Sequence, residues 1–252
     1  MIDITAYTTK GLYRGVNQDG ILINDEILTE GKGYFNLDHN VLLAVADGVG
    51  GMPHGEVASF ETLQVIKSLL QGPDLSGTVL RQTFDQCISR LKELQKTAEK
   101  YSGMATTLSG IMINEANKVT VFNIGNSRVY RMRNGFLRQL TTDDTLVNRL
   151  PEYIYEKMKQ NISHIITKCI SATANSTDVV VVEGKFRVQE DDIVVLTTDG
   201  VHDYIDFDTL EKIIASGESS DAIISEIESV INEIPQHDNF SIIIAKVRAE
   251  NG

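Results

Sequence analysis

The stretch Val41-Leu42-Leu43-Ala44-Val45-Ala46-Asp47-Gly48-Val49-Gly50-Gly51 runs from an unbroken apolar segment directly into an acid and three glycines. An apolar run of this length, without alternating polar residues, is typical of a strand that is covered on both faces. The glycines allow the backbone that follows to turn sharply or to approach a ligand closely. We therefore predict a buried strand that ends on the Asp47 carboxylate.

The same order of residues returns far downstream in Ile193-Val194-Val195-Leu196-Thr197-Thr198-Asp199-Gly200. A single Asp-Gly pair is most often a hairpin turn. Two apolar strands that each end on Asp-Gly instead predict two carboxylates that meet at strand ends. Buried like charges need a cation or a proton between them, and a bound metal is the simpler of these two explanations.

Two further acids flank apolar strands in the same manner. Asp19 precedes a short apolar segment near the N-terminus, and Asp238 precedes the last apolar segment of the chain. Taken alone, either acid is explained equally well as a turn or cap residue. Together with Asp47 and Asp199 they predict a cleft of hard oxygen ligands, which suit magnesium or manganese. The sequence lacks the paired His or Cys residues of a zinc site.

Gly48 and Arg14 fit such a site. Because Gly48 has no side chain, its carbonyl oxygen can approach a metal directly. Arg14 lies in a glycine-rich loop with Asp19 and carries a planar fork of donors that can hold a phosphate at two points. An arginine beside acids is otherwise a surface salt bridge, so this function of Arg14 depends on the metal site.

Composition narrows the class of protein. The 252 residues are 42% hydrophobic, which is enough for one sizeable core, and we expect a single domain over residues 1–252. The 23 Lys and Arg against 35 Asp and Glu give a net charge of −12, which argues against a nucleic acid or an anionic membrane as partner. Cys87 and Cys169 lack a metal-type spacing. With no targeting or membrane-spanning segment, we expect a cytoplasmic location.

The order of predicted elements favours antiparallel sheets with helices on the outside. Apolar residues recur at helical spacing over residues 57–70 and 80–94, and Asn134-Gly135 is a strong hairpin turn within a series of strands. The remaining predictions are strands over residues 2–9, 21–24, 104–111, 119–124, 128–133, 136–140, 179–183 and 240–247, and helices over 142–168, 210–215 and 222–231. This is not the strand–helix alternation of a doubly wound sheet.

Eight short segments, in this order, resemble those of a known family along nearly the whole chain, and together they are specific. They are Arg14-Gly15-Val16-Asn17-Gln18-Asp19, Ala46-Asp47-Gly48-Val49-Gly50-Gly51, Gly55-Glu56-Val57-Ala58-Ser59, Met104-Ala105-Thr106-Thr107-Leu108, Asn123-Ile124-Gly125-Asn126-Ser127-Arg128-Val129-Tyr130, Leu140-Thr141-Thr142-Asp143, Thr198-Asp199-Gly200 and Asp238-Asn239. The chain resembles bacterial-type metal-dependent protein phosphatases of the type 2C class. The resemblance implies an α+β fold, a four-layer α/β/β/α sandwich with a metal centre in the cleft between two antiparallel sheets.

The resemblance also implies residue roles. Asp47 would bridge two Mn²⁺ or Mg²⁺ ions, Gly48 would offer a backbone oxygen to one, and Asp199 and Asp238 would complete the other. Asp19 would hold metal-bound water, and Arg14 would grip the phosphate. Paired ions lower the pKa of a water that can then attack phosphorus without an enzyme nucleophile. The expected partner is a phosphorylated protein substrate, such as a serine/threonine kinase or its targets.

Departures from the family pattern leave alternatives open. Asn126 stands where the family usually has an acid for a third metal, so we expect a third site to be weak or absent. Val49 replaces the histidine that is suspected of protonating the leaving alcohol in eukaryotic members, and His54 is a nearby substitute. Residues 150–164 correspond to a variable flap near the active site. The alternative function is a catalytically silent member that binds a phosphoprotein as a regulatory module.

Overall fold

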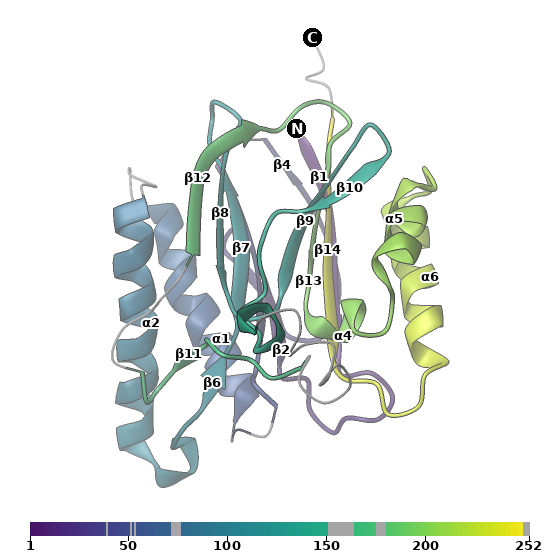
Figure 1. Cartoon of the computed structure of the whole chain (residues 1–252). Helices are drawn as coiled ribbons and strands as arrows, with labels where there is room; N and C mark the ends of the chain where they lie inside the picture. The colour runs from purple at the N-terminus through teal and green to yellow at the C-terminus, as the bar shows by residue number, and fades with distance from the viewer. Residues whose placement is uncertain are drawn as a thin grey trace.

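Two antiparallel sheets lie face to face at the centre of the molecule, with helices on both outer sides (Figure 1). The computed structural model describes residues 1–38, 40–50, 52, 54–71, 77–150, 164–174 and 180–248. The arrangement confirms the four-layer α/β/β/α sandwich that the sequence predicts, because every strand pair in both sheets is antiparallel.

The two sheets divide the chain in an interleaved way. The first sheet has the strand order β10 (Phe136–Gln139), β9 (Arg128–Arg133), β13 (Ile193–Thr197), β14 (Phe240–Val247), β1 (Ile2–Thr9) and β4 (Gly31–Leu37). The second sheet has the order β12 (Val180–Arg187), β8 (Lys118–Ile124), β7 (Leu108–Ile113), β5 (Val41–Asp47), β2 (Asp19–Ile23) and β3 (Glu26–Leu28). A further pair joins β6 (Ala105–Thr106) to β11 (Ile170–Ser171).

Strand β5 explains why its sequence is apolar without alternation. Val41, Leu43 and Val45 face the other sheet and belong to the core between the sheets. Leu42 and Ala44 face the opposite way and belong to the core beneath α1 (Gly55–Lys67) and α2 (Gly77–Thr97). Because side chains of a strand alternate between its two faces, a strand covered on both sides must be apolar at every position.

The first sheet is covered on its outer face by α5 (Phe207–Ala215) and α6 (Ser220–Asn232). Both helices begin with a side-chain cap, since Asp206 accepts from the Thr209 N–H and Ser219 from the Ala222 N–H. Between β13 and α5 lies the short helix α4 (Asp199–His202), and single 3₁₀ turns cover Ser68–Gln71, Glu99–Tyr101 and Val147–Arg149. Within the described residues, no helix has the length and apolar character needed to cross a bilayer.

Some short or edge elements were not predicted, and one predicted helix was wrong. Strands β3 and β4 were missed, because β4 lies at a sheet edge and contains Gly31 and Gly33, which hide its alternation. Helix α4 is too short to leave a periodic pattern. The helix expected over residues 142–168 is absent at its described ends, where Thr145 instead forms a β-bridge with Ile166; residues 151–163, and with them most of the expected flap, lie outside the described residues.

Gly110 of β7 allows the sheet to pack, and it yields a test of the core. A Cβ atom at this position would lie 2.1 Å from Phe122 Cζ and 2.7 Å from the Leu43 carbonyl oxygen. Because Phe122 is fully buried, we expect Gly110→Ala to lower the free energy of unfolding by about 1–3 kcal/mol, measured by urea denaturation. In the control Gly15→Ala, the new Cβ meets no atom within 4 Å, so unfolding should stay within about 0.5 kcal/mol of wild type. Equal stability of Gly110→Ala and wild type would show that Phe122 has room to move.

Candidate metal centre and active site

The four predicted acids come together at one end of the sandwich, from strands of both sheets. In the second sheet, Asp19 at the start of β2 lies directly opposite Asp47 at the end of β5 in the antiparallel register. In the first sheet, Asp199 follows β13 and Asp238 precedes β14, which is the neighbouring strand. The end of one strand and the start of its antiparallel neighbour must lie at the same sheet edge, so the topology places all four acids together.

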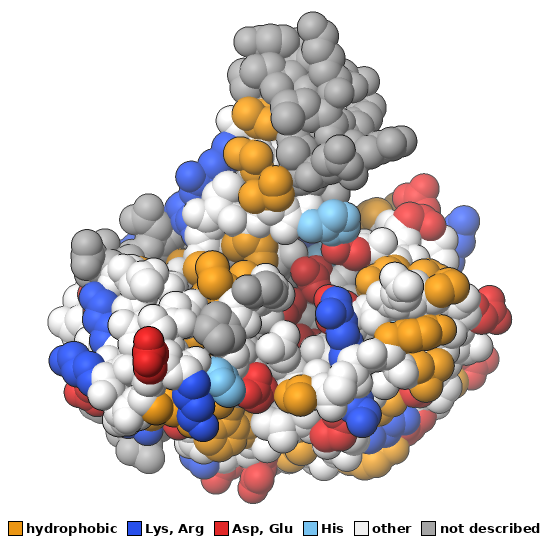
Figure 2. Space-filling view, turned by 90° about the horizontal axis from the view of Figure 1, so that it is seen from below, with side chains coloured by type: hydrophobic (Ala, Val, Ile, Leu, Met, Phe, Trp, Pro, Cys, Tyr) orange, Lys and Arg blue, Asp and Glu red, His pale blue; other side chains and the backbone are white. Residues whose placement is uncertain are grey.

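A cleft of about 770 Å³ opens at this end of the molecule. Figure 2 shows the hollow with acidic side chains inside it and a basic side chain at its edge. The residues that line it are Arg14, Gln18, Asp47, Gly48, Val49, Gly50, His164, Ile165, Ile166, Asp199, Asp203, Tyr204, Asp238 and Asn239. Of the predicted site residues, Asp19 alone does not line the cleft.

The surroundings of the Asp47 carboxyl group disfavour its ionised form. Desolvation raises its pKa well above the usual value, and the charges of Asp199 and Asp19 raise it further. The charge of Asp238 acts in the same direction. Several buried or half-buried acids this close together cannot all ionise without a compensating cation.

Asp19 lies beneath the cleft and joins the two sheets. Its side chain is only 2% exposed. One carboxylate oxygen accepts hydrogen bonds from the Thr198 and Ser241 hydroxyl groups, both at 2.7 Å, across from the first sheet. Burial raises the pKa of Asp19 to about 7, although the two hydroxyl donors lower it. Neither hydroxyl residue was predicted to contact Asp19. The one indication in the sequence is that Thr198 directly precedes Asp199.

Two threonines, for which the sequence predicted no role, form hydrogen bonds with the backbone of Asp47. The Thr107 N–H and the Thr106 hydroxyl both donate to the Asp47 carbonyl oxygen, at 2.8 and 2.9 Å. The Asp47 N–H donates in return to Thr107 Oγ1 at 3.1 Å. With its backbone bonded from both sides, Asp47 presents its carboxyl group from a rigid strand end.

Gly48 is needed for close packing. A Cβ atom at this position would lie 2.5 Å from both Cα and the carbonyl carbon of Gly55, the first residue of α1. The N-terminus of α1 therefore approaches the end of β5 more closely than any side chain would allow. Packing therefore requires glycine at position 48 whether or not a ligand binds there.

Arg14 and Asp238 form an ion pair at the mouth of the cleft. The Arg14 Nη2 atom lies 2.6 Å from Asp238 Oδ2, and both side chains are about half exposed. A guanidinium group has five N–H donors in a planar fork, so the bond to Asp238 leaves donors for a phosphate. The structure thus brings Arg14 to the acids, as a phosphate-binding role requires.

Asn126 contacts the acids directly. Its side-chain Nδ2 donates to Asp199 Oδ2 at 2.9 Å. The Asn126 Oδ1 atom is buried without a hydrogen-bond partner in the described structure. An amide can donate a hydrogen bond to Asp199 where an ionised acid would repel it.

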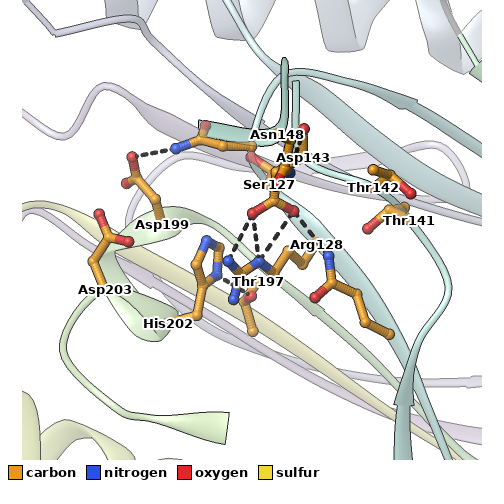
Figure 3. A network of polar contacts seen from close by, with 12 residues as sticks. Ser127, Arg128, Thr141, Thr142, Asp143, Asn148, Thr197, Asp199, His202 and Asp203 are labelled. Carbon is orange, nitrogen blue, oxygen red and sulfur yellow. Dashed lines mark hydrogen bonds and ion pairs between the residues drawn. The ribbon is translucent and has the colours of Figure 1, made fainter. Parts of the chain in front are cut away.

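Arg128 secures the loop that carries Asn126. Its guanidinium group pairs with Asp143 at 2.6 Å, and Gln139 donates to the same carboxylate at 2.8 Å (Figure 3). Asp144, next in the chain, accepts from the Gly125 N–H at 3.2 Å. Asp143 and Asp144, which follow β10, therefore support the β8–β9 loop and have a structural role.

The described histidines differ in their relation to the cleft. His54 lies outside the lining residues, in the left-handed conformation that precedes α1, and pairs with Glu56 at 3.0 Å. His202 is bonded to Thr197 at 3.0 Å, and desolvation lowers its pKa well below the usual value. His237 is fully buried and bonded to the Asp238 carbonyl oxygen. His164 lines the cleft.

In the described part of the chain, no three His, Cys, Asp or Glu side chains form a ready-made metal cage. Two of the four acids have other partners: the carboxylate of Asp238 is bonded to Arg14, and that of Asp19 to two hydroxyl groups. The oxygen atoms available to a cation in the cleft are therefore those of Asp47, Asp199 and the Gly48 backbone, with Asp238 exchanging its partner.

Comparison with known proteins agrees with this geometry. The family model described as Protein phosphatase 2C matches residues 16–230. The chain is 27% identical to the serine/threonine phosphatase stp of Listeria monocytogenes over 257 residues, which cover 95% of this chain and 93% of that protein.

Solved structures share the fold. The serine/threonine phosphatase Stp1 from Staphylococcus aureus has a TM-score of 0.79 and 23% identity, with 99% of this chain and 96% of that chain covered. The catalytic domain of the serine/threonine protein phosphatase PstP, in complex with two manganese ions, has a TM-score of 0.74 and 23% identity, covering 99% and 100%. At such identities the structural likeness shows the fold alone, but the family model spans most of the sequence. The chain therefore belongs to the protein phosphatase 2C family.

Proposed function

We propose that the protein hydrolyses phosphoserine and phosphothreonine in other proteins, with two manganese or magnesium ions as cofactors. The observation that carries the proposal is that Asp47, Asp199 and Asp238 line one cleft, with Arg14 at its mouth. Serine/threonine phosphatases among the relatives, one of them with two bound manganese ions, support the substrate class and the metal.

The donor set fits divalent cations. Carboxylate and carbonyl oxygens are hard ligands of the kind that magnesium and manganese prefer. Desolvation and the charges of Asp199 and Asp19 raise the pKa of Asp47, and a bound cation would relieve this repulsion. Asp47, Gly48, Asp199 and Asp238 would hold the ions, and Asp19 would add negative charge from beneath. When bound, such ions activate water and neutralise charge on a phosphoryl group.

The protein's own groups orient the substrate. Arg14 offers a planar fork to two phosphoryl oxygens, which fixes the phosphate at the mouth of the cleft. Because Arg14 and Asp238 of the cleft are about half exposed, the site suits a phosphorylated side chain of a protein better than a buried metabolite. A serine/threonine kinase or one of its targets is the phosphoprotein that we expect as physiological partner.

Removal of either shared carboxylate tests the metal assignment. We expect Asp47→Ala and Asp199→Ala to lower manganese-dependent hydrolysis of p-nitrophenyl phosphate by about 100-fold or more, because the ions supply several kcal/mol of transition-state stabilisation. Asp208→Ala, an exposed acid in the first turn of α5, is the matched control and should retain activity. Wild-type-like turnover in either cleft variant would contradict the assignment, and no turnover in wild type would favour the silent regulatory module.

The stability of the metal-free protein should depend on pH through Asp19. Its pKa is about 7 in the folded chain, well above the usual value of about 4 for an Asp carboxyl group, so the folded state binds more protons over this range. Stability is therefore lost as pH rises from about 4 to 7. We expect the midpoint of thermal unfolding in EDTA to fall between pH 5 and pH 8, and manganese to restore more stability at pH 8. In Asp19→Asn this part of the pH dependence should vanish; its persistence would show that another group is responsible.

Arg14 should act mainly on substrate binding. A fork that holds the phosphate in both the ground state and the transition state contributes nearly uniform binding, so Arg14→Ala should raise KM more than it lowers kcat. Loss of a charged hydrogen bond predicts a rise of roughly 10-fold or more. Steady-state kinetics on a phosphothreonine peptide measure this, with Arg138→Ala on β10 as a control outside the cleft. An unchanged KM would remove Arg14 from the site.

A further inference from the structure

We propose that His164, held by Asp203, is the general acid that protonates the serine or threonine oxygen as it leaves phosphorus. The inference rests on the proposed phosphatase function and adds a residue to it. Hydrolysis of an alkyl phosphate releases a strongly basic alkoxide, so a proton donor in the cleft lowers the barrier. Val49 lines the cleft without a titratable group, which leaves this task to another side chain.

His164 is placed for the task. It lines the same cleft as Asp47, Asp199 and Arg14. Of the histidines in the described part of the chain, it is the one that does so. Its side chain is 67% exposed, so it can exchange protons with solvent between turnovers.

Asp203 fixes the ring. His164 Nδ1 lies 2.8 Å from Asp203 Oδ2, so the carboxylate accepts the Nδ1 proton and leaves Nε2 as the nitrogen available for transfer. Asp203 is one helical turn beyond Asp199, and its N–H donates to the Asp199 carbonyl oxygen at 2.9 Å. The pair is thus attached to the helix that begins on a proposed metal ligand, and Figure 3 shows Asp203 beside Asp199.

The segment that follows His164 is anchored. The Leu146 N–H donates to the Ile165 carbonyl oxygen at 2.8 Å, and Thr145 forms a β-bridge with Ile166. The Thr167 N–H donates to the Asp144 carbonyl oxygen at 2.7 Å. These bonds tie the histidine to the same loop that Arg128 and Asp143 secure, so His164 is not carried on a free chain end.

Other titratable groups of the cleft suit the role less well. The Asp203 carboxyl group is already bonded to His164 Nδ1 at 2.8 Å, so it holds the ring rather than facing the leaving group. Desolvation raises the pKa of Tyr204, whose hydroxyl group also accepts the Asp238 N–H. A phenol with a raised pKa is a poor proton donor near neutral pH.

The proton balance is simple. The ester P–O bond breaks, and its electron pair stays on the serine or threonine oxygen, which takes the proton from His164 Nε2. Water supplies the oxygen of the new bond to phosphorus and releases one proton to solvent, and inorganic phosphate leaves. The neutral imidazole then takes a proton from solvent.

The test compares leaving groups. In His164→Asn, the amide can keep the contact with Asp203 but has no transferable proton. We expect the ratio of kcat for a phosphoserine peptide to kcat for p-nitrophenyl phosphate, in manganese, to fall about 100-fold, because the p-nitrophenolate anion leaves without protonation. The ratio for phenyl phosphate over p-nitrophenyl phosphate should fall in the same direction. These two small substrates are alike in size, so a role of His164 in peptide binding would not change that second ratio.

His54→Asn is the matched control, since it removes a histidine that does not line the cleft. It should leave both ratios at the wild-type values, and thermal unfolding should show that both variants are folded. Unchanged ratios in His164→Asn, or an equal fall in His54→Asn, would overturn the role of His164 while the phosphatase function stands. Absence of manganese-dependent turnover in the wild type would instead overturn the phosphatase function, and the proposed acid with it.

Discussion

Repulsion among four carboxylates at one end of the sandwich is the constraint to which the rest of the site responds. Desolvation and the charges of Asp199 and Asp19 hold the pKa of Asp47 well above its usual value. Hydroxyl groups from the opposite sheet stabilise Asp19, and Arg14 neutralises Asp238. Of the three acids that line the cleft, Asp238 has a positive partner in Arg14, whereas Asp47 and Asp199 have none among the described residues. A divalent cation completes this arrangement because it supplies the charge that the protein leaves out.

The fold keeps these groups in place with backbone contacts and neutral side chains. Thr106 and Thr107 form hydrogen bonds with the Asp47 backbone. Because Gly48 has no side chain, the N-terminus of α1 packs in van der Waals contact with the strand end. Gly200 does the same on the other sheet, where a Cβ atom would lie 1.8 Å from the Asn239 carbonyl oxygen. Close backbone packing on both sides means that the acids are presented from two rigid sheet ends, with the repulsion among them offset by the cores of the sandwich.

The sequence predicted the elements whose pattern is set by burial, and it failed where the pattern is set by a partner. Strand β5 and helix α2 follow from apolar spacing, and the Asn134-Gly135 turn follows from two residues that adopt positive φ, at 53° and 80°. Strand β4 was not predicted, because its pairing with β1, and not its own composition, makes it a strand. The acids at strand ends could be predicted because apolar runs such as that of β5 mark the strands. Thr198 and Ser241 could not be predicted, because their role depends on contact with Asp19 in the other sheet. His164 could not be assigned from the sequence, because its relation to Asp203 arises from tertiary structure alone.

Asn126 shows how one amide changes the charge of the site. An aspartate at this position would add a fifth negative charge beside Asp199 and would need a further cation. The amide instead donates to Asp199 and leaves its own Oδ1 buried without a partner. A neutral carbonyl oxygen is a weak ligand for a divalent cation compared with a carboxylate. The site therefore has the charge for two ions and gains, in place of a third, a fixed orientation of Asp199. Asn126 thus bonds the first residue of α4, the short helix that leads to Asp203, and Asp203 contacts the proposed acid His164.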